Sequence, residues 1–310
     1  QRITTRASLF VYASGVSGYF AVVGAYGAST AYVYYRSGTT WSLQATLTGT
    51  SSTYFGYSVA IDGDTVVVGA PEESTSYTYS GAIYVYTRSG TTWSLQGSMI
   101  KASDASGSAR LGWAVDIDGD SIISGAYRDG GNHGAAYVYI RSGSTWSQQQ
   151  KLTSGNPTSS EDQFGQSVSI SGDTCAVGAW QEDTTASDSG AVFMFDRSGT
   201  TWGTPTKLKA SDAAASDRFG SSVAIDGNMM VIGAQYEDTT ATNAGQAYLF
   251  SRSGSTWSED DKVQGSNVMA SAGFGNMVAI SSGTAIIAAA GQTSGSGGSQ
   301  AGAGAAYRFI

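Results

Sequence analysis

The fold can be inferred from one repeated segment, Phe55–Tyr86. It reads FGYSVAIDGDTVVVGAP at 55–71, continues through a polar loop, and ends in GAIYVY at 81–86. The segment TRSGTTWSL follows at 87–95, and the whole unit then recurs along the chain. Copies begin with Phe-Gly or a counterpart at positions 10, 55, 111, 164, 219 and 274. A repeat of roughly 50 residues with strand-like content is typical of a radial array or a solenoid.

The second copy predicts four antiparallel strands. An Asp-Gly pair is the favoured chemistry of a two-residue hairpin turn, and runs of Val, Ile, Tyr and Trp favour strands. The expected elements are a strand at Ser58–Ile61, a turn at Asp62-Gly63, a strand at Thr65–Gly69, a loop at Glu72–Ser80, a strand at Ala82–Arg88 and a fourth strand from Trp93.

The third strand of each copy is apolar on both faces. It reads YVY at 32–34 and 137–139, FMF at 193–195 and YLF at 248–250. A sheet with one solvated face would alternate apolar and polar residues. Sheets that pack face to face around an axis cover both faces of every sheet. The sequence therefore predicts an all-β fold in which each copy is one sheet.

The pattern Phe-Gly, then Gly-Ala-Pro, then Gly resembles the FG-GAP repeat of integrin α-subunit propellers and of many microbial and protist surface proteins. Only the second copy carries the complete Gly69-Ala70-Pro71; elsewhere Gly-Ala is followed by Tyr26, Tyr127, Trp180 or Gln235. The resemblance implies an extracellular or cell-surface β-propeller with four-stranded antiparallel blades. We expect one domain over residues 1–310 with repeats at 10–54, 55–110, 111–163, 164–218, 219–273 and 274–310.

Six copies predict six blades, whereas integrin-type propellers have seven, so a seven-bladed propeller remains the alternative. The last copy ends after its third strand. We expect residues 1–9, with a strand at about Arg2–Ser8, to complete it, because such closure removes an open sheet edge.

Composition excludes several classes of function. The net charge is −8 and the pI about 4.6, with no basic stripe, which argues against binding to nucleic acid or to anionic membranes. No apolar run approaches the ~20 residues that span a bilayer, so membrane insertion is not expected. Cys175 is the only cysteine, and we expect it to be a small buried hydrophobe.

Connectivity separates two ends of every sheet. The turns between strands one and two and between strands three and four lie at one end, and they are short. The other connections are long, varied and acidic; examples are Glu72–Ser80, Glu161–Gln163, Gln181–Ser189 and Tyr236–Ala244. Binding residues are usually carried by variable loops on a rigid scaffold. We therefore expect binding at the end with the long connections, which we call the loop end.

Aromatic residues in or beside these loops are candidates for ligand binding. They could stack on sugar rings or anchor a protein partner, or they could pack at the base of the loops. Both interpretations remain open at this point. The candidates are Tyr77, Tyr79, Tyr127, Trp180 and Tyr236, with Tyr54 beside them.

Calcium is the only cofactor that the sequence suggests. Integrin-type FG-GAP blades hold Ca²⁺ in a D-x-D-x-D-G loop between strands one and two, but this chain has a tight turn there. Pairs such as Asp62 with Asp64 supply two carboxylates, whereas Ca²⁺ takes ~6–8 oxygen ligands. The remaining candidate set lies in the long loops, where two copies share acids in register; the alternative is a solvated acidic loop. The candidates are Glu182, Asp183, Asp188, Glu237 and Asp238.

Five arginines each precede a tryptophan by five residues, as Arg88 precedes Trp93 and Arg141 precedes Trp146. Within a hairpin this spacing predicts that guanidinium and indole stack. A sugar-binding platform repeated in each blade is the alternative.

Catalysis is disfavoured. His133 is the only histidine, and no nucleophile pattern accompanies it. We predict a non-catalytic surface propeller that makes protein–protein contacts, including self-assembly into an adhesive or filamentous structure. The alternatives are a carbohydrate-binding lectin and, less favoured, a glycoside hydrolase that uses paired carboxylates.

Overall fold

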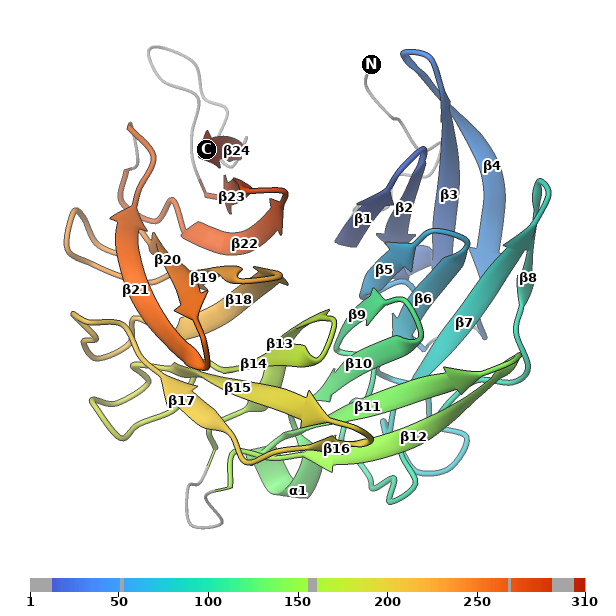
Figure 1. The fold of residues 1–310 in the computed structure, drawn as a ribbon, viewed down its shortest axis with the longest axis horizontal. Helices are drawn as coiled ribbons and strands as arrows, with labels where there is room; N and C mark the ends of the chain where they lie inside the picture. Colours follow the sequence, from blue (N-terminus) through green and yellow to red (C-terminus); the bar gives the residue numbers. More distant parts are fainter. Residues whose placement is uncertain (1–12, 51–52, 156–160, 267–268, 292–303, 310) are drawn as a thin grey trace. The chain divides into compact units, whose positions relative to one another are not determined.

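A computed structural model describes residues 13–50, 53–155, 161–266, 269–291 and 304–309. The chain divides into two compact units, 1–152 and 153–310, and each unit is considered by itself. The described residues form six antiparallel sheets, three in each unit, which we call blades one to six (Figure 1).

Unit 1 holds blades one to three, and in each the strands are neighbours in chain order. Blade one comprises β1 (Ala13–Ser17), β2 (Phe20–Ala25), β3 (Thr30–Ser37) and β4 (Thr40–Thr48), with a 3-10 helix η1 (Tyr26–Ala28). Blade two comprises β5 (Val59–Asp62), β6 (Thr65–Ala70), β7 (Ala82–Ser89) and β8 (Thr92–Leu95). Blade three comprises β9 (Ala114–Asp118), β10 (Ser121–Ala126), β11 (Ala135–Ser142) and β12 (Thr145–Leu152), with the short helix α1 (Asp129–Asn132).

Unit 2 holds blades four to six. Blade four comprises β13 (Phe164–Ser171), β14 (Thr174–Ala179), β15 (Ala191–Ser198), β16 (Thr201–Trp202) and β17 (Thr206–Leu208). Blade five comprises β18 (Phe219–Asp226), β19 (Met229–Ala234), β20 (Gln246–Ser253) and β21 (Thr256–Val263). Blade six comprises β22 (Phe274–Ser281), β23 (Thr284–Ala289) and β24 (Ala305–Phe309).

The predicted fold class, a β-propeller of six mainly four-stranded antiparallel blades, is confirmed. Both β16 and β17 pair with β15, so the fourth strand of blade four is divided, and Pro205 lies between its two parts. Proline interrupts a strand because it cannot donate a ladder hydrogen bond. The strand expected at Arg2–Ser8 lies outside the described residues.

The Gly-Ala signature has a steric cause that involves the next blade. A Cβ atom on Gly69 would lie 2.1 Å from the carbonyl oxygen of Gly112, the glycine of the following Leu-Gly pair. In unit 2, a Cβ on Gly233 would lie 1.9 Å from the oxygen of Gly275. No side chain fits such a contact, so glycine is required where neighbouring blades approach most closely.

The Phe-Gly signature fills the core between blades. Phe55 is fully buried and meets the ring of Tyr84 edge-on, with centroids 5.1 Å apart. Phe219 contacts Tyr248 in the same way at 5.2 Å. Edge-on aromatic pairs contribute about 0.5–1.5 kcal/mol beyond the area that they bury. Cys175 is buried, as expected.

The tight turns are used to join neighbouring blades. The Oδ2 atom of Asp62 accepts the backbone N–H of Gly119 at 2.8 Å, and Oδ2 of Asp226 accepts that of Ser282 at 2.7 Å. A second acid follows the turn; Asp120, for example, pairs with Arg141 at 2.6 Å. These contacts give the turn acids a structural role.

The predicted stacking of arginine on tryptophan is present at four hairpins. The guanidinium carbon lies 5.0–5.6 Å from the indole centroid in the pairs Arg36–Trp41, Arg141–Trp146, Arg197–Trp202 and Arg252–Trp257. The fifth arginine, Arg88, instead lies 4.5 Å from the ring of Phe20 in blade one. No helix in the described residues has the length and apolarity to cross a membrane.

Candidate functional site at the loop end

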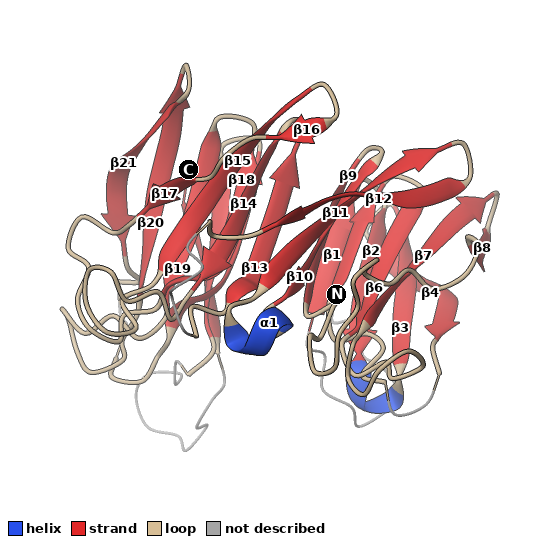
Figure 2. Cartoon of the chain, turned by 90° about the horizontal axis from the view of Figure 1, so that it is seen from below, coloured by secondary structure: helices blue, strands red, loops and turns tan. Residues whose placement is uncertain are grey.

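In each unit the long connections gather at one end of the sheets and the tight hairpins at the other (Figure 2). One buried acid organises each loop between the second and third strands of blades two to five. Its backbone oxygen accepts the N–H of the glycine that precedes the third strand, at 2.9–3.0 Å. These acids are Glu73, Asp129, Glu182 and Glu237.

The side chains of the three glutamates also accept hydrogen bonds from their own loops. Glu182 accepts the N–H of Thr184 at 3.1 Å and forms an ion pair with Lys207. Burial alone would raise the pKa of Glu182, but the hydrogen bonds and the charge of Lys207 outweigh it, and the pKa is lowered. Glu182 is therefore ionised, its charge is balanced by Lys207, and its hydrogen bonds hold the loop in place.

The five acids proposed as calcium ligands are not brought together. Asp183 accepts the backbone N–H of Asp188 at 2.6 Å, and Asp238 accepts that of Asn243 at 2.5 Å. Glu237 accepts the N–H of Thr239 at 2.7 Å. Over the part of the chain that is described, no three Asp, Glu, His or Cys side chains converge in a way that could hold a metal ion.

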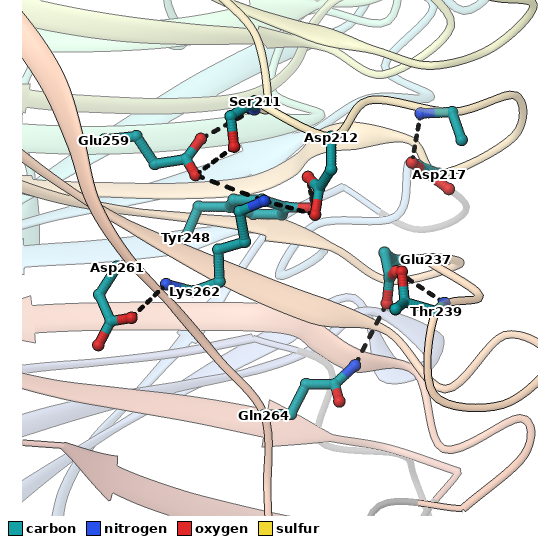
Figure 3. Close-up of polar contacts among 11 residues, drawn as sticks. Ser211, Asp212, Asp217, Glu237, Thr239, Tyr248, Glu259, Asp261, Lys262 and Gln264 are labelled. Atoms are coloured by element: carbon teal, nitrogen blue, oxygen red, sulfur yellow. Dashed lines mark hydrogen bonds and ion pairs between the residues drawn. The ribbon is translucent and has the colours of Figure 1, made fainter.

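Blade five carries a cluster of carboxylates, shown in Figure 3. Asp212 accepts the hydroxyl of Tyr248 at 2.9 Å and pairs with Lys262 at 2.6 Å. Asp217, which is 4% exposed, accepts the N–H of Ala214 at 2.7 Å. Burial raises the pKa of Asp217 to about 6, and the charges of nearby acids, Glu237 among them, add to this effect.

Unit 1 carries a continuous row of aromatic rings across its three blades, which we call the aromatic row. Neighbouring ring centroids lie 4.3–6.4 Å apart. Tyr54 is 38% exposed, whereas Tyr57 is buried. The row consists of Tyr26, Tyr54, Tyr57, Trp113 and Tyr127.

Sequence reasoning had singled out Tyr54 and Tyr127 as binding candidates and missed the other three members of the row. The signal that could have found them is positional: Tyr57 and Trp113 directly follow Phe-Gly or Leu-Gly, and Tyr26 directly follows Gly-Ala.

The two other tyrosines proposed for unit 1 lie in the loop of blade two. Tyr77 is 57% exposed. Tyr79 lies under the guanidinium of Arg110, which is 5.7 Å from its ring centroid and 5.9 Å from that of Trp113. Arg110 also pairs with Glu72 at 3.3 Å. The exposed ring of Tyr79 therefore lies beside a paired arginine.

In unit 2 the proposed residues Trp180 and Tyr236 both contact one arginine. The guanidinium carbon of Arg218 lies 4.6 Å from the ring centroid of Trp180 and 4.7 Å from that of Tyr236. The indole N–H of Trp180 donates to Oε1 of Gln163 at 2.7 Å, and this hydrogen bond fixes the orientation of the indole ring. Sequence reasoning did not identify Arg218.

A cavity of about 240 Å³ lies beside Tyr236, between the loops of blades five and six. Gln235 and Asn276 line it and occupy the repeat positions that Tyr26 and Tyr57 fill with rings in unit 1. Among the described residues, Oδ1 of Asn276 is buried without a hydrogen-bond partner. Amides thus replace rings at two positions that line this cavity.

Charge is distributed unequally between the two units. Unit 1 contains nine Lys and Arg residues and nine Asp and Glu residues. Unit 2 contains seven basic and fifteen acidic residues, which accounts for the whole net charge of −8. A ligand at the loop end of unit 2 therefore meets a negative potential.

Four segments of the chain match the sequence model of the family described as FG-GAP repeat, at residues 41–86, 93–139, 146–195 and 202–250. Together they cover more than half of the chain. Each begins at a tryptophan of a fourth strand and ends in the third strand of the next blade. No curated protein matches the chain.

Proposed function

Because the chain belongs to the FG-GAP repeat family, we propose that it is a non-catalytic β-propeller that is extracellular or exposed on a cell surface. It binds a protein partner or further copies of itself through the loop end of its blades, as an adhesive or filament-forming component.

The observation that carries this proposal is the aromatic row, with Arg110 and Tyr79 beside it and the exposed Tyr77 in the same loop as Tyr79. Tyr, Trp and Arg are the residue types enriched where protein interfaces gain most of their binding energy. Ring-to-ring contacts at 4.3–6.4 Å hold these side chains in place before any partner arrives. Binding then costs less side-chain entropy than it would with mobile side chains.

The non-catalytic part of the proposal is supported by what the buried acids do. Glu73, Glu182 and Glu237 each accept backbone N–H groups of their own loop. A residue used in the same way in several blades has a structural reason to be there. Asp217 differs because its pKa is raised to about 6, yet it is buried and bonded to Ala214.

Site-specific photo-crosslinking on the cells that produce the protein tests the proposal. A photoreactive amino acid replaces Tyr77, at the loop end, or Tyr19, which is equally exposed but lies in the turn between β1 and β2. We expect a protein adduct from position 77 and none from position 19. Adducts at both positions alike, or at neither, would contradict a loop-end interface.

Carbohydrate binding is the second candidate, and the cavity beside Tyr236 favours it. Amide and hydroxyl groups of Gln235, Asn243 and Ser271 line that cavity, together with the tyrosine ring. Such groups match the hydroxyls and the C–H face of a sugar. A glycan array with Asn276→Tyr as control provides the test: the added ring should remove every genuine hit, and an array without hits discards this candidate.

A further inference from the structure

Two arginines occupy the same position in the repeat and the same local structure. Arg110 precedes Leu111-Gly112 and Arg218 precedes Phe219-Gly220. Their backbones share positive φ values of 62° and 58°. Their backbone N–H groups donate to the residue at the same place in the preceding blade's loop, at 3.0 and 3.1 Å. Both guanidinium groups lie close to two aromatic rings, at 5.7 and 5.9 Å from the ring centroids for Arg110 and at 4.6 and 4.7 Å for Arg218.

The two arginines differ in what satisfies their charge. Arg110 pairs with Glu72, the second residue after Gly-Ala in blade two. The corresponding residue of blade four is Gln181, whose amide oxygen accepts a hydrogen bond from Gln163. Across the described ranges, Arg218 forms no ion pair. Within the same ranges the Nε atoms of both arginines are buried without an acceptor, so the ion pair is what distinguishes them.

This geometry favours a carboxylate ligand. The planar guanidinium presents paired N–H donors that match a carboxylate, and such bidentate pairs are stronger than neutral hydrogen bonds. The guanidinium of Arg218 lies close to the rings of both Trp180 and Tyr236. Its terminal nitrogens form no hydrogen bond with the described residues and are not buried, so a ligand can reach them. Hydrogen bonds to charged groups contribute about 1.5–3 kcal/mol, more than neutral ones do.

We propose that Arg218 receives a single Asp or Glu side chain of a protein partner, in the place that Glu72 occupies on Arg110. This inference rests on the proposed protein-binding function. The net charge of unit 2 restricts the partner further, because a strongly acidic segment would be repelled. The segment that binds therefore carries its carboxylate among neutral or basic residues.

The test is an NMR titration of the labelled full-length chain with the peptide acetyl-Gly-Ser-Glu-Ser-Gly-amide. The Nε–Hε signal of Arg218 is identified by its loss in Arg218→Lys. We expect this signal to shift with the glutamate peptide and to stay unchanged with the matched glutamine peptide. Equal responses to both peptides, or no response to either, would overturn the proposal.

Two reciprocal variants distinguish carboxylate binding at Arg218 from nonspecific binding of the peptide. Gln181→Glu places an internal carboxylate where Glu72 lies in blade two, so peptide affinity should fall about tenfold or more. Glu72→Gln should open Arg110 and produce a second responding signal. Undiminished binding to Gln181→Glu, with an unchanged melting temperature, would refute the assignment.

A parallel titration with glucuronate distinguishes the source of the carboxylate. A response to glucuronate without a response to the peptide would replace the protein partner by an acidic sugar and overturn the proposal as stated. Outcomes for the two proposals also separate. If the Arg218 signal does not shift but position 77 forms crosslinks, only the carboxylate site at Arg218 is refuted. A responsive Arg218 without crosslinking removes the proposed unit 1 interface and keeps Arg218 as a carboxylate site.

Discussion

Asp217→Asn should stabilise the protein at neutral pH. Asp217 is buried at the loop end of blade five, and burial raises its pKa to about 6, with Glu237, Asp212 and Asp238 contributing. The N–H of Ala214 lowers the pKa but does not compensate. An asparagine oxygen can accept the same N–H without a charge, so the substitution removes repulsion and keeps the hydrogen bond.

The size of the stability gain and its pH range follow from the difference between the pKa of Asp217 in the folded and unfolded states. A folded-state pKa near 6 against an ordinary value of 3.8 corresponds to about 3 kcal/mol. Protonated Asp217 stabilises the fold fully below pH 4, and this contribution is lost as the pH rises through 6. The variant should therefore gain up to about 3 kcal/mol of unfolding free energy at pH 7 and almost nothing at pH 4.

Urea unfolding of both proteins at pH 4, 5, 6 and 7 measures this difference directly. Acids with lowered pKa values, such as Glu182 and Asp104, produce the opposite trend, because their contribution to the stability of the fold is lost as the pH falls. Both proteins share this trend, so it cancels when their unfolding free energies are subtracted at each pH. Asp260→Asn, at an exposed position of β21, is the control and should change little. A gain that is equal at pH 4 and pH 7, or a loss at pH 7, would refute the reasoning.

Three further predictions concern contacts between blades and metal binding. Gln44→Ala removes the acceptor of the buried Trp93 indole N–H, a 2.8 Å bond between blades one and two, and should cost about 1–3 kcal/mol in urea unfolding; Leu43→Ala, at an exposed position, should cost less. Gly69→Ala places a Cβ 2.1 Å from the oxygen of Gly112 and should cost about 3 kcal/mol or more, so an unchanged melting temperature would contradict the close contact. Added Ca²⁺ should leave the melting temperature unchanged because the loop acids already have internal partners, and a rise reversed by chelator would establish a calcium site.

The strands were predictable because their signals are local. Asp62-Gly63 identifies a turn from two residues, and the observed β5 and β6 agree with the expected strands to within one residue. What the turn acid does was not predictable: Asp62 bonds Gly119, a residue of the next copy. Contacts over such separations depend on how neighbouring sheets approach, and a pattern in one copy does not contain that information.

The candidate site was predicted in part for the same reason. Tyr77 and Tyr79 were found because they lie in a loop whose variability is visible in the sequence. Tyr57 and Trp113 were missed because they follow a signature pair and were assigned to the repeat framework. Arg218 was missed because its environment combines Trp180 of blade four with Tyr236 of blade five.

The repeats also act as internal controls for function. A position that neighbouring blades approach closely, such as Gly69 or Gly233, is glycine in the first five copies, because a side chain at Gly69 or Gly233 would separate the blades. A position that changes while its surroundings repeat is informative in a different way. Glu72 forms an ion pair with Arg110, whereas Gln181 at the same place leaves Arg218 without an ion pair within the described residues. Arg218 therefore keeps its position in the repeat but lacks the internal carboxylate. Positions where one copy has lost such a partner are the first places to test for ligand binding.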